Sequence, residues 1–224
     1  WRSRDAGDQS ITQQRLDISN LLDRIKALKM VDNFLKQIEV SPQLLIEKDY
    51  KVLSVDLLVY LNQLIKADDN YINTYINEVS EYLKTIHIGA FERLKVIDRM
   101  KYYFVMKKEK QKVLDLIEYE KTQLKKNKPR LINGVYIYNN YPYSEQVPFN
   151  YKITDAEFKL MQKIESLRWD NNKLIATGYA FIQNIDMKTK NSSDLKVFLV
   201  DKEENIKIPI PNIKLIKKIG RASC

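Results

Sequence analysis

Apolar residues in the first part of the chain recur at steps of three and four, the spacing that places side chains on one face of an α-helix. The first stripe follows Ser10–Gln13, a Ser-Ile-Thr-Gln sequence that fits a helix capping box. Ser41 and Pro42 end this helix and begin another, because proline is well tolerated at the first helical position. Asp68-Asp69 and Gly89 interrupt later stripes, so the pattern predicts a bundle of several short amphipathic helices. The apolar positions of the first stripe are Ile18, Leu21, Leu22, Ile25, Leu28, Val31, Leu35 and Ile38.

The pattern changes near residues 125–129, after which prolines become more frequent and apolar residues alternate with polar ones. Asn133-Gly134 is a turn pair ahead of a short β-rich segment, and residues 173–182 are rich in β-forming side chains. Residues 195–200 and 206–210 flank a polar five-residue loop, which is typical of a hairpin. These segments predict an antiparallel, sandwich-like β-region.

One helical segment, from Thr154 through Ile164, is expected to interrupt the strands, because Thr154-Asp155-Ala156-Glu157 is typical of a helix start. The whole pattern therefore predicts an α+β chain, with helices first and strands second.

The chain has 224 residues and a formal net charge of +9, from 38 basic and 29 acidic side chains. Residues 128–224 hold 16 of the basic and 10 of the acidic side chains, so the second part carries more positive charge per residue. A basic chain favours polyanionic partners, such as nucleic acid, an anionic membrane face or an anionic cell-wall polymer. No apolar run approaches the roughly 18 residues that a membrane span needs.

Residue types that support catalysis are scarce in this sequence. Cys224 is the single cysteine and His87 the single histidine, which excludes an internal disulfide framework and a multi-histidine metal site. The five glycines never cluster into a phosphate-binding loop, and no Asp-x-Asp sequence occurs. Asp68-Asp69 lies at a turn where acidic residues usually cap helices, and His87 lies at a helix end where a structural role is favoured. We therefore expect this chain by itself to be non-catalytic and to bind no metal or other cofactor.

Aromatic side chains gather after the change of pattern, with five tyrosines between Tyr136 and Tyr151 and a tryptophan at position 169. Rings beside basic residues can stack on sugars or bases, whereas the same rings can instead fill a small sandwich core. The basic residues near the C-terminus can contact a polyanion or form a solvated terminus. The candidate polymer-binding residues are Tyr136, Tyr138, Tyr141, Tyr143, Arg168, Trp169, Lys214, Lys217 and Lys218.

Two stretches of the chain are distinctive. The first is residues 1–4 (Trp-Arg-Ser-Arg) with Ser10–Arg15, and the second is residues 168–174 (Arg-Trp-Asp-Asn-Asn-Lys-Leu) with residues 178–182 (Gly-Tyr-Ala-Phe-Ile). The first resembles the exit from the catalytic domain in family 2 glycosyltransferases of teichoic acid and capsule synthesis. The second resembles the accessory β-domain of those enzymes, including the wall teichoic acid glycosyltransferases and the glycosyltransferase–glycerophosphotransferase fusions.

The resemblance implies a fragment in three parts. Residues 1–15 would be the exit segment of a missing catalytic domain, residues 16–127 a helical linker domain, and residues 128–224 an antiparallel, immunoglobulin-like β accessory domain. The family's β-region commonly runs longer, so the sandwich is expected to be incomplete. Arg2 and Arg4 would neutralise the diphosphate of the sugar donor. The Asp-x-Asp sequence and a divalent Mg or Mn ion would belong to the missing catalytic domain.

The resemblance further implies a non-catalytic C-terminal part of a bacterial glycosyltransferase, which binds the acceptor polymer, forms oligomers or does both. Its implied partners are an anionic polyol-phosphate or glycan polymer, its own catalytic domain, further copies of the chain and the inner face of the bacterial plasma membrane. Two alternatives remain open: a basic nucleic-acid-binding or scaffold module, and a self-contained enzyme. Steeply salt-dependent DNA binding would favour the first, and turnover by the purified chain the second.

Overall fold

The computed structural model describes residues 16–138, 140–149, 154, 157, 160–182, 185, 198–200, 203 and 206–210. The chain divides into two compact units, one of residues 1–161 with 182–184 and the other of residues 162–181 with 185–224. Helices dominate the first unit and strands the second, which confirms the predicted α+β class.

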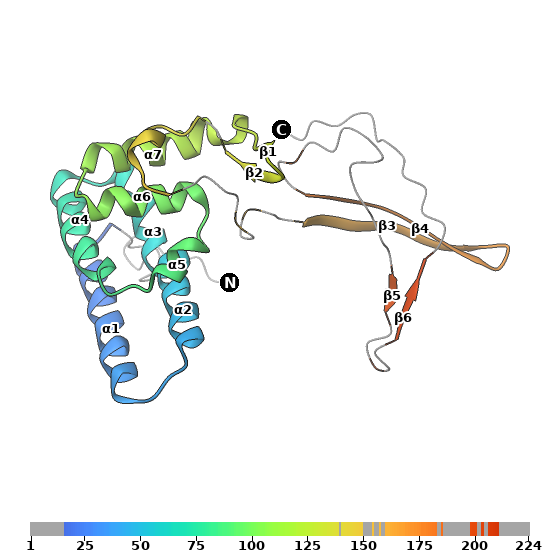
Figure 1. The fold of residues 1–224 in the computed structure, drawn as a ribbon, viewed down its shortest axis with the longest axis horizontal. Helices are drawn as coiled ribbons and strands as arrows, with labels where there is room; N and C mark the ends of the chain where they lie inside the picture. The colour runs from blue at the N-terminus through green and yellow to red at the C-terminus, as the bar shows by residue number, and fades with distance from the viewer. Residues whose placement is uncertain are drawn as a thin grey trace, which may run out of the picture. The chain divides into compact units, whose positions relative to one another are not determined.

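The helical unit is built from α-helices joined by short π and 3-10 turns (Figure 1). Its α-helices are α1 (Ile18–Gln37), α2 (Pro42–Lys51), α3 (Leu58–Leu61), α4 (Asp69–Leu83), α5 (Ile88–Glu92), α6 (Val96–Met106) and α7 (Lys110–Thr122). The shorter turns are the π-helix η1 (Val52–Leu57) and the 3-10 turns η2 (Leu64–Lys66), η3 (Leu124–Lys126) and η4 (Ser144–Gln146). α6 packs against α4 and α7, α1 packs against α4, and α2 packs against α5. The predicted set of short packed helices is therefore confirmed.

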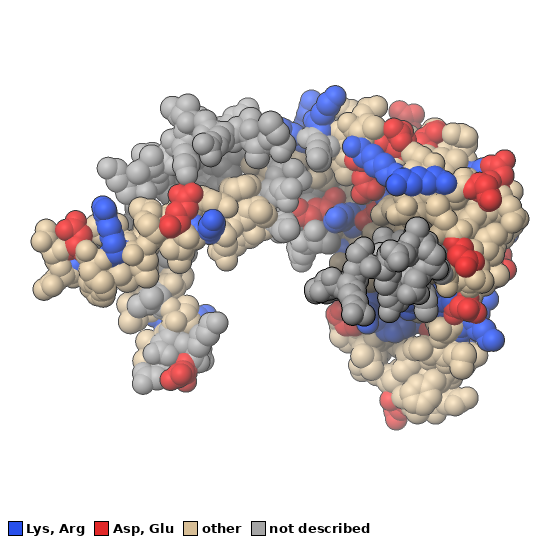
Figure 2. Space-filling view, turned by 180° about the vertical axis from the view of Figure 1, so that it is seen from behind, with Lys and Arg blue, Asp and Glu red and all other residues tan. Residues whose placement is uncertain are grey.

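Basic and acidic side chains are interspersed over the helical unit on the face that Figure 2 shows. Within the helical unit several charged side chains form pairs, such as Arg93 with Glu47 at 2.7 Å and Lys48 with Asp32 at 2.5 Å. On this face, the net positive charge of the chain does not form one broad basic surface.

Side chains at the helix starts explain where the helices begin. The Ser41 hydroxyl accepts a hydrogen bond from the Leu44 amide at 3.2 Å, with Pro42 next to it, as predicted. Asp68 caps α4 through the Tyr71 amide at 2.7 Å, which confirms its capping role. α1 begins later than the sequence suggested, because Asp17 caps it through the Ser19 amide. The expected capping box at residues 10–13 lies outside the described residues.

His87 has the structural role that its sequence context favoured, but at the start of a helix. Its Nδ1 atom accepts a hydrogen bond from the Gly89 amide at 3.1 Å, which caps α5. Asp49, which is buried, accepts the His87 amide at 2.7 Å and fixes the same turn. The helix terminus at His87 is therefore a start and not an end, since its ring accepts a hydrogen bond from an N–H group of the first turn of α5.

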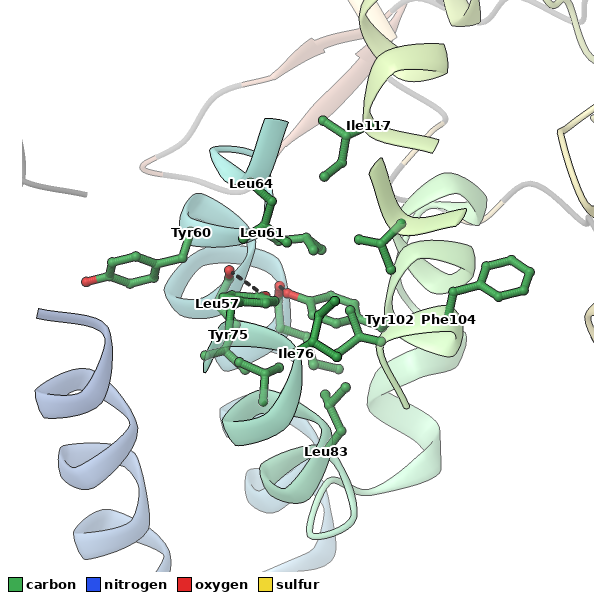
Figure 3. Packing of buried hydrophobic residues seen from close by; sticks show 14 of the residues in the cluster. Leu57, Tyr60, Leu61, Leu64, Tyr75, Ile76, Leu83, Tyr102, Phe104 and Ile117 are labelled. Atoms are coloured by element: carbon green, nitrogen blue, oxygen red, sulfur yellow. Dashed lines mark hydrogen bonds between the residues drawn. The ribbon is translucent and has the colours of Figure 1, made fainter. Parts of the chain in front are cut away.

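Two buried tyrosines hold the π-helix in the centre of the helical core. The Tyr102 hydroxyl donates to the Leu53 carbonyl at 2.6 Å, and the Tyr75 hydroxyl donates to the Leu57 carbonyl at 3.2 Å (Figure 3). Burial raises the pKa of both phenols well above the ordinary value, so they remain neutral donors. Because Tyr75 comes from α4 and Tyr102 from α6, these bonds tie three segments of the chain together.

A buried lysine forms a second polar cluster in the same unit. Lys101 on α6 is fully buried, and its Nζ atom lies 2.5 Å from Glu120, 3.1 Å from Asp98 and 3.0 Å from Asn62. The three oxygen partners come from α6, α7 and the end of α3, so the lysine fixes the positions of these helices. A buried charge is tolerated when its hydrogen-bonding capacity is used in this way.

The first apolar stripe is only partly buried. Leu21, Ile25 and Leu28 lie in the core, whereas Val31 and Ile38 are each 44% exposed. The stripe therefore faces the core along only part of its length. The C-terminal end of α1 extends beyond α4 (Figure 1), although Lys29 still lies 3.9 Å from Glu78 of α4.

A short hairpin and a tyrosine-rich segment follow α7. β1 (Arg130–Ile132) and β2 (Val135–Ile137) pair antiparallel, with Ile132 opposite Val135. Asn133 and Gly134 have φ values of 51° and 76°, as the tight turn of such a hairpin requires, which confirms the predicted turn. The segment after β2 then returns to the helices, where Tyr138 and Tyr141 are buried in the helical core.

The strand unit contains two further hairpins. β3 (Leu160–Asp170) pairs with β4 (Lys173–Ile182), and β5 (Phe198–Val200) pairs antiparallel with β6 (Lys207–Pro209). Asn171 and Asn172 form the turn of the first hairpin, with φ values of 45° and 61°. Among the described residues the strands form separate two-stranded sheets, and these include the strands predicted within residues 173–182, 195–200 and 206–210.

β3 also corrects one expectation. Residues 160–164 were expected to end a helix, but they begin β3 and so belong to a long hairpin. The Ser166 and Thr177 hydroxyls lie 2.6 Å apart across this hairpin. Pairing with β4 supplies backbone hydrogen bonds to this segment, and tertiary pairing of this kind overrides a local helix signal.

A partly buried glutamate, Glu157, attaches the end of the helical unit to α6. The Glu157 carboxylate accepts the amides of Val96 at 3.3 Å and Thr154 at 3.1 Å, and so caps the first turn of α6. The Thr154 hydroxyl donates to the Leu94 carbonyl at 3.2 Å. Burial raises the pKa of the Glu157 carboxyl, whereas these amides and Arg99 act in the opposite direction.

Tyr102→Phe should destabilise the helical unit by about 1–2 kcal/mol, because the Leu53 carbonyl would lose its buried donor. Urea denaturation followed by the helical circular dichroism signal measures this change. The matched variant Tyr179→Phe removes the hydroxyl of a tyrosine that is 41% exposed, and should change the free energy of unfolding by less than about 0.5 kcal/mol. Equal effects of the two substitutions would contradict the role of the Tyr102 phenol.

Glu157→Gln should flatten the pH dependence of stability. Because the folded protein holds the Glu157 proton more tightly than the unfolded chain does, the free energy of unfolding should fall as the pH rises from the ordinary pKa of 4.5 through the raised one. The glutamine variant cannot ionise and should lack this component. Urea denaturation at several values between about pH 4 and pH 8 measures it, with the exposed Glu39→Gln as control. Parallel curves for Glu157→Gln and the parent chain would disprove the assignment.

Candidate functional site

An open groove runs along the second half of α7, within the helical unit. It consists of two adjoining hollows of about 480 Å³ and 660 Å³, a size typical of ligand sites. Both hollows are lined by the four polar residues Tyr119, Thr122, Gln123 and Asn140. Because these residues line both hollows, the two hollows adjoin, and we refer to them together as the groove.

Tyr119 organises the floor of the groove. Its hydroxyl donates to the Asn140 carbonyl at 3.1 Å and accepts the Asn127 side-chain amide at 3.0 Å. Its ring meets that of Tyr141 edge to face, with 5.8 Å between the ring centroids. Tyr119 on α7 thus holds Asn127, in the segment that follows the helix, and Asn140, in the segment that follows β2.

Three cations lie at one end of the groove. Lys126, Lys128 and Arg130 line the larger hollow, and all three side chains are exposed. They come from the end of η3 and the start of β1, on a short stretch that the Asn127 contact with Tyr119 anchors. Exposed cations are hydrated, and an anion can replace these water molecules with charge-assisted hydrogen bonds. This end of the groove therefore suits a phosphate or a carboxylate.

Two carboxylates lie at the other end. Asp115 and Glu118 line the smaller hollow, one helical turn apart on α7. Asp115 accepts hydrogen bonds from the Tyr143 hydroxyl and, at 2.8 Å, from the Gln111 side chain. The bond to Asp115 raises the pKa of the Tyr143 phenol, so that this tyrosine stays protonated and keeps the carboxylate in place.

The structure separates the tyrosines that the sequence grouped as polymer-binding residues. Tyr138 and Tyr141 are only 5% and 4% exposed, so their ring faces pack in the helical core and cannot stack on a polymer in this conformation. Tyr136 and Tyr143 are partly exposed and pack against the same core. The tyrosines do fill a core, as one of the two alternatives stated, but it is the helical core and not that of a β-sandwich.

The remaining candidate residues fall into two groups. Arg168 and Trp169 lie near the end of β3, in the strand unit, and Trp169 is 74% exposed. The others lie outside the described residues: Arg2, Arg4, Lys214, Lys217 and Lys218.

One signal for the groove is present in the sequence. Residues 125–130 read Lys-Lys-Asn-Lys-Pro-Arg, a basic run that marks the boundary between helices and strands, and residues 126–130 of this run line the larger hollow. Nothing in the sequence placed Tyr119 and Asn140 together, because 21 residues separate them and a tertiary contact joins them.

No family model, curated protein or solved structure matches the chain. Within the described part of the chain, no three His, Cys, Asp or Glu side chains are grouped so that they could hold a metal ion. In that same part, none of the helices combines the length and the apolar character that crossing a membrane requires.

Tyr119→Phe should loosen the groove floor, because it removes one donor and one acceptor that hold residues 127 and 140. We expect a loss of about 1 kcal/mol in the free energy of unfolding, and faster amide hydrogen exchange in residues 126–130 and 140–143. Hydrogen exchange with mass spectrometry measures the local effect. Unchanged exchange in both segments would show that the phenol does not organise the groove.

Proposed function

We propose that this chain is the non-catalytic C-terminal part of a bacterial glycosyltransferase of teichoic acid or capsular polymer synthesis, and that it binds the anionic acceptor polymer. Two features support the proposal: the resemblance of residues 1–15 and 168–182 to that family, and the order of helices before strands. The observation that carries the binding role is the groove with Lys126, Lys128 and Arg130 at one end.

The chemistry of the groove suits a polyol-phosphate. Lys126, Lys128 and Arg130 supply N–H donors for phosphate oxygens, and an arginine can bind such oxygens with two parallel hydrogen bonds. The side chains of Thr122, Gln123 and Asn140 offer hydroxyl and amide groups, which can exchange hydrogen bonds with polyol hydroxyls. The groove is open along its length, as the binding of a polymer segment requires.

For the strand unit we infer a sandwich-like accessory domain. Its exposed apolar side chains would be covered by other strands of the same unit or by further copies of the chain. The support is the exposure of large apolar side chains on the β3–β4 hairpin, where Ile164 is 69% exposed, Leu167 61% and Trp169 74%. A two-stranded hairpin is at best marginally stable alone, so a covering layer is expected. Assembly of the parent enzyme through this unit is the second role that we propose.

The other parts of the proposal concern the parent enzyme. Its catalytic domain would precede this chain, bind a nucleotide-sugar with Mg or Mn, and act at the cytoplasmic face of the bacterial membrane. Arg2 and Arg4 would assist with the donor diphosphate.

The triple variant Lys126→Ala, Lys128→Ala and Arg130→Ala should weaken binding of a short poly(glycerol phosphate) at least about tenfold, because it removes charge-assisted hydrogen bonds. It should also reduce the dependence of binding on salt. Isothermal titration calorimetry at two salt concentrations measures both effects. The control is Lys26→Ala, Lys36→Ala and Lys51→Ala, which removes the same charge from exposed positions of α1 and α2.

Equal weakening by the two triple variants would show that net charge and not the groove attracts the polymer. Duplex DNA that binds more tightly than poly(glycerol phosphate) at the same salt would instead favour the nucleic-acid-binding alternative.

A further inference from the structure

Three cations line the larger hollow at alternate positions of the chain. Lys126, Lys128 and Arg130 are exposed, whereas Asn127 and Pro129 between them are partly buried. Side chains alternate in this way along an extended chain, because successive residues point to opposite sides. The three cations therefore lie on one side of the segment, where they line the same hollow.

The backbone of this segment is extended and anchored. Asn127 follows η3 and has extended φ and ψ values of −81° and 104°. Lys128 precedes Pro129, and a residue before proline disfavours the helical region. β1 begins directly afterwards, at Arg130. Because the Asn127 side-chain amide donates to the Tyr119 hydroxyl at 3.0 Å, α7 holds the segment in place between two of its cations.

The spacing of the cations matches one kind of polyol-phosphate. Alternate residues of an extended chain are about 6.5 Å apart and are joined by six backbone bonds. A glycerol phosphate repeat, in which three carbons join successive phosphates, also has six chain bonds from one phosphorus atom to the next. A ribitol phosphate repeat has five carbons and eight such bonds, so it is about 2 Å longer when extended. Across two repeats this difference grows to about 4 Å.

Neutral polar groups complete the larger hollow. Within the described part of the chain, no carboxylate is among the residues that line it, so the cations remain available to phosphates. Thr122, Gln123 and Asn140 line the same hollow. Their hydroxyl and amide groups can exchange hydrogen bonds with the polyol hydroxyls between two phosphates.

We propose that Lys126, Lys128 and Arg130 bind three successive phosphates of a polymer with a three-carbon repeat, a glycerol phosphate, in preference to a five-carbon ribitol phosphate. The inference rests on the proposed function and deepens it, since it defines the repeat length of the polymer that binds best. Selectivity arises from the spacing of the cations and not from their number. The longer repeat must be compressed by about 4 Å to keep contact with both outer cations, and this compression costs affinity.

The test compares two short probes that carry three phosphates each, one joined through glycerol and the other through ribitol. Isothermal titration calorimetry at one salt concentration should give about threefold to tenfold tighter binding of the glycerol probe, the size expected for one weakened contact. A second pair of probes, joined through propane-1,3-diol and pentane-1,5-diol, should show the same order. This pair separates repeat length from the number of hydroxyl groups.

Two matched variants remove the same charge but leave different spacings. Lys126→Ala leaves two adjacent cations, one repeat apart, and should reduce the preference to less than about twofold, because the mismatch is halved. Lys128→Ala leaves the two outer cations, two repeats apart, and should weaken binding of both probes but retain the preference. Both lysines are exposed, so neither substitution should disturb the core.

Each outcome decides one of the two proposals. Equal affinity for the two probes, tighter binding of the ribitol probe, or the same change of preference in both variants would overturn the inference about repeat length, while the polyol-phosphate role stands. Failure of every probe to bind the parent chain would overturn the proposed function itself.

Discussion

The helical unit depends on the satisfaction of buried backbone carbonyls in its π-helix. Leu53 and Leu57 lie in the centre of the core, where an unpaired carbonyl would be costly, and the phenols of Tyr102 and Tyr75 donate to them. These donors come from α6 and α4, so the two helices must lie against the π-helix for the core to close. The π-helix thus specifies that α4 and α6 pack around it, because its carbonyls need the donors on these two helices. Apolar contacts alone would be less selective.

The same packing places α7 where it can support a binding surface. Val113, Leu116 and Ile117 bury one side of this helix, and Glu120 meets the buried Lys101 of α6. The opposite side is then free to present polar residues, and Tyr119 joins it to the segments on both sides of the β1–β2 hairpin. A rigid helix that is anchored on one face and polar on the other is a suitable support for ligand recognition.

The tyrosines illustrate how far residue type predicts a role. An aromatic cluster beside basic residues is compatible with polymer stacking and with core packing, because a tyrosine has both an apolar ring and a polar hydroxyl. In the folded chain Tyr138 and Tyr141 are buried, although Tyr141 still forms part of the lining of the smaller hollow. The floor of the groove is organised by Tyr119, which the sequence did not single out. Burial depends on what packs against a residue. The local sequence does not predict which distant segment that is.

The sequence by itself determined the periodic elements of this protein: helical spacing in the first part, alternation in the second, and turns at Ser41-Pro42, Asp68-Asp69 and Asn133-Gly134. These features are local, because side-chain periodicity, capping and the φ angles of turn residues act within a few positions. Tertiary structure alone decided that residues 160–164 form a strand, that Val31 and Ile38 stay exposed, and that residues 126–130 and Asn140 line a common hollow beside α7. Each of these depends on which distant segment supplies hydrogen bonds or covers apolar surface, and that choice follows from the packing of the whole unit.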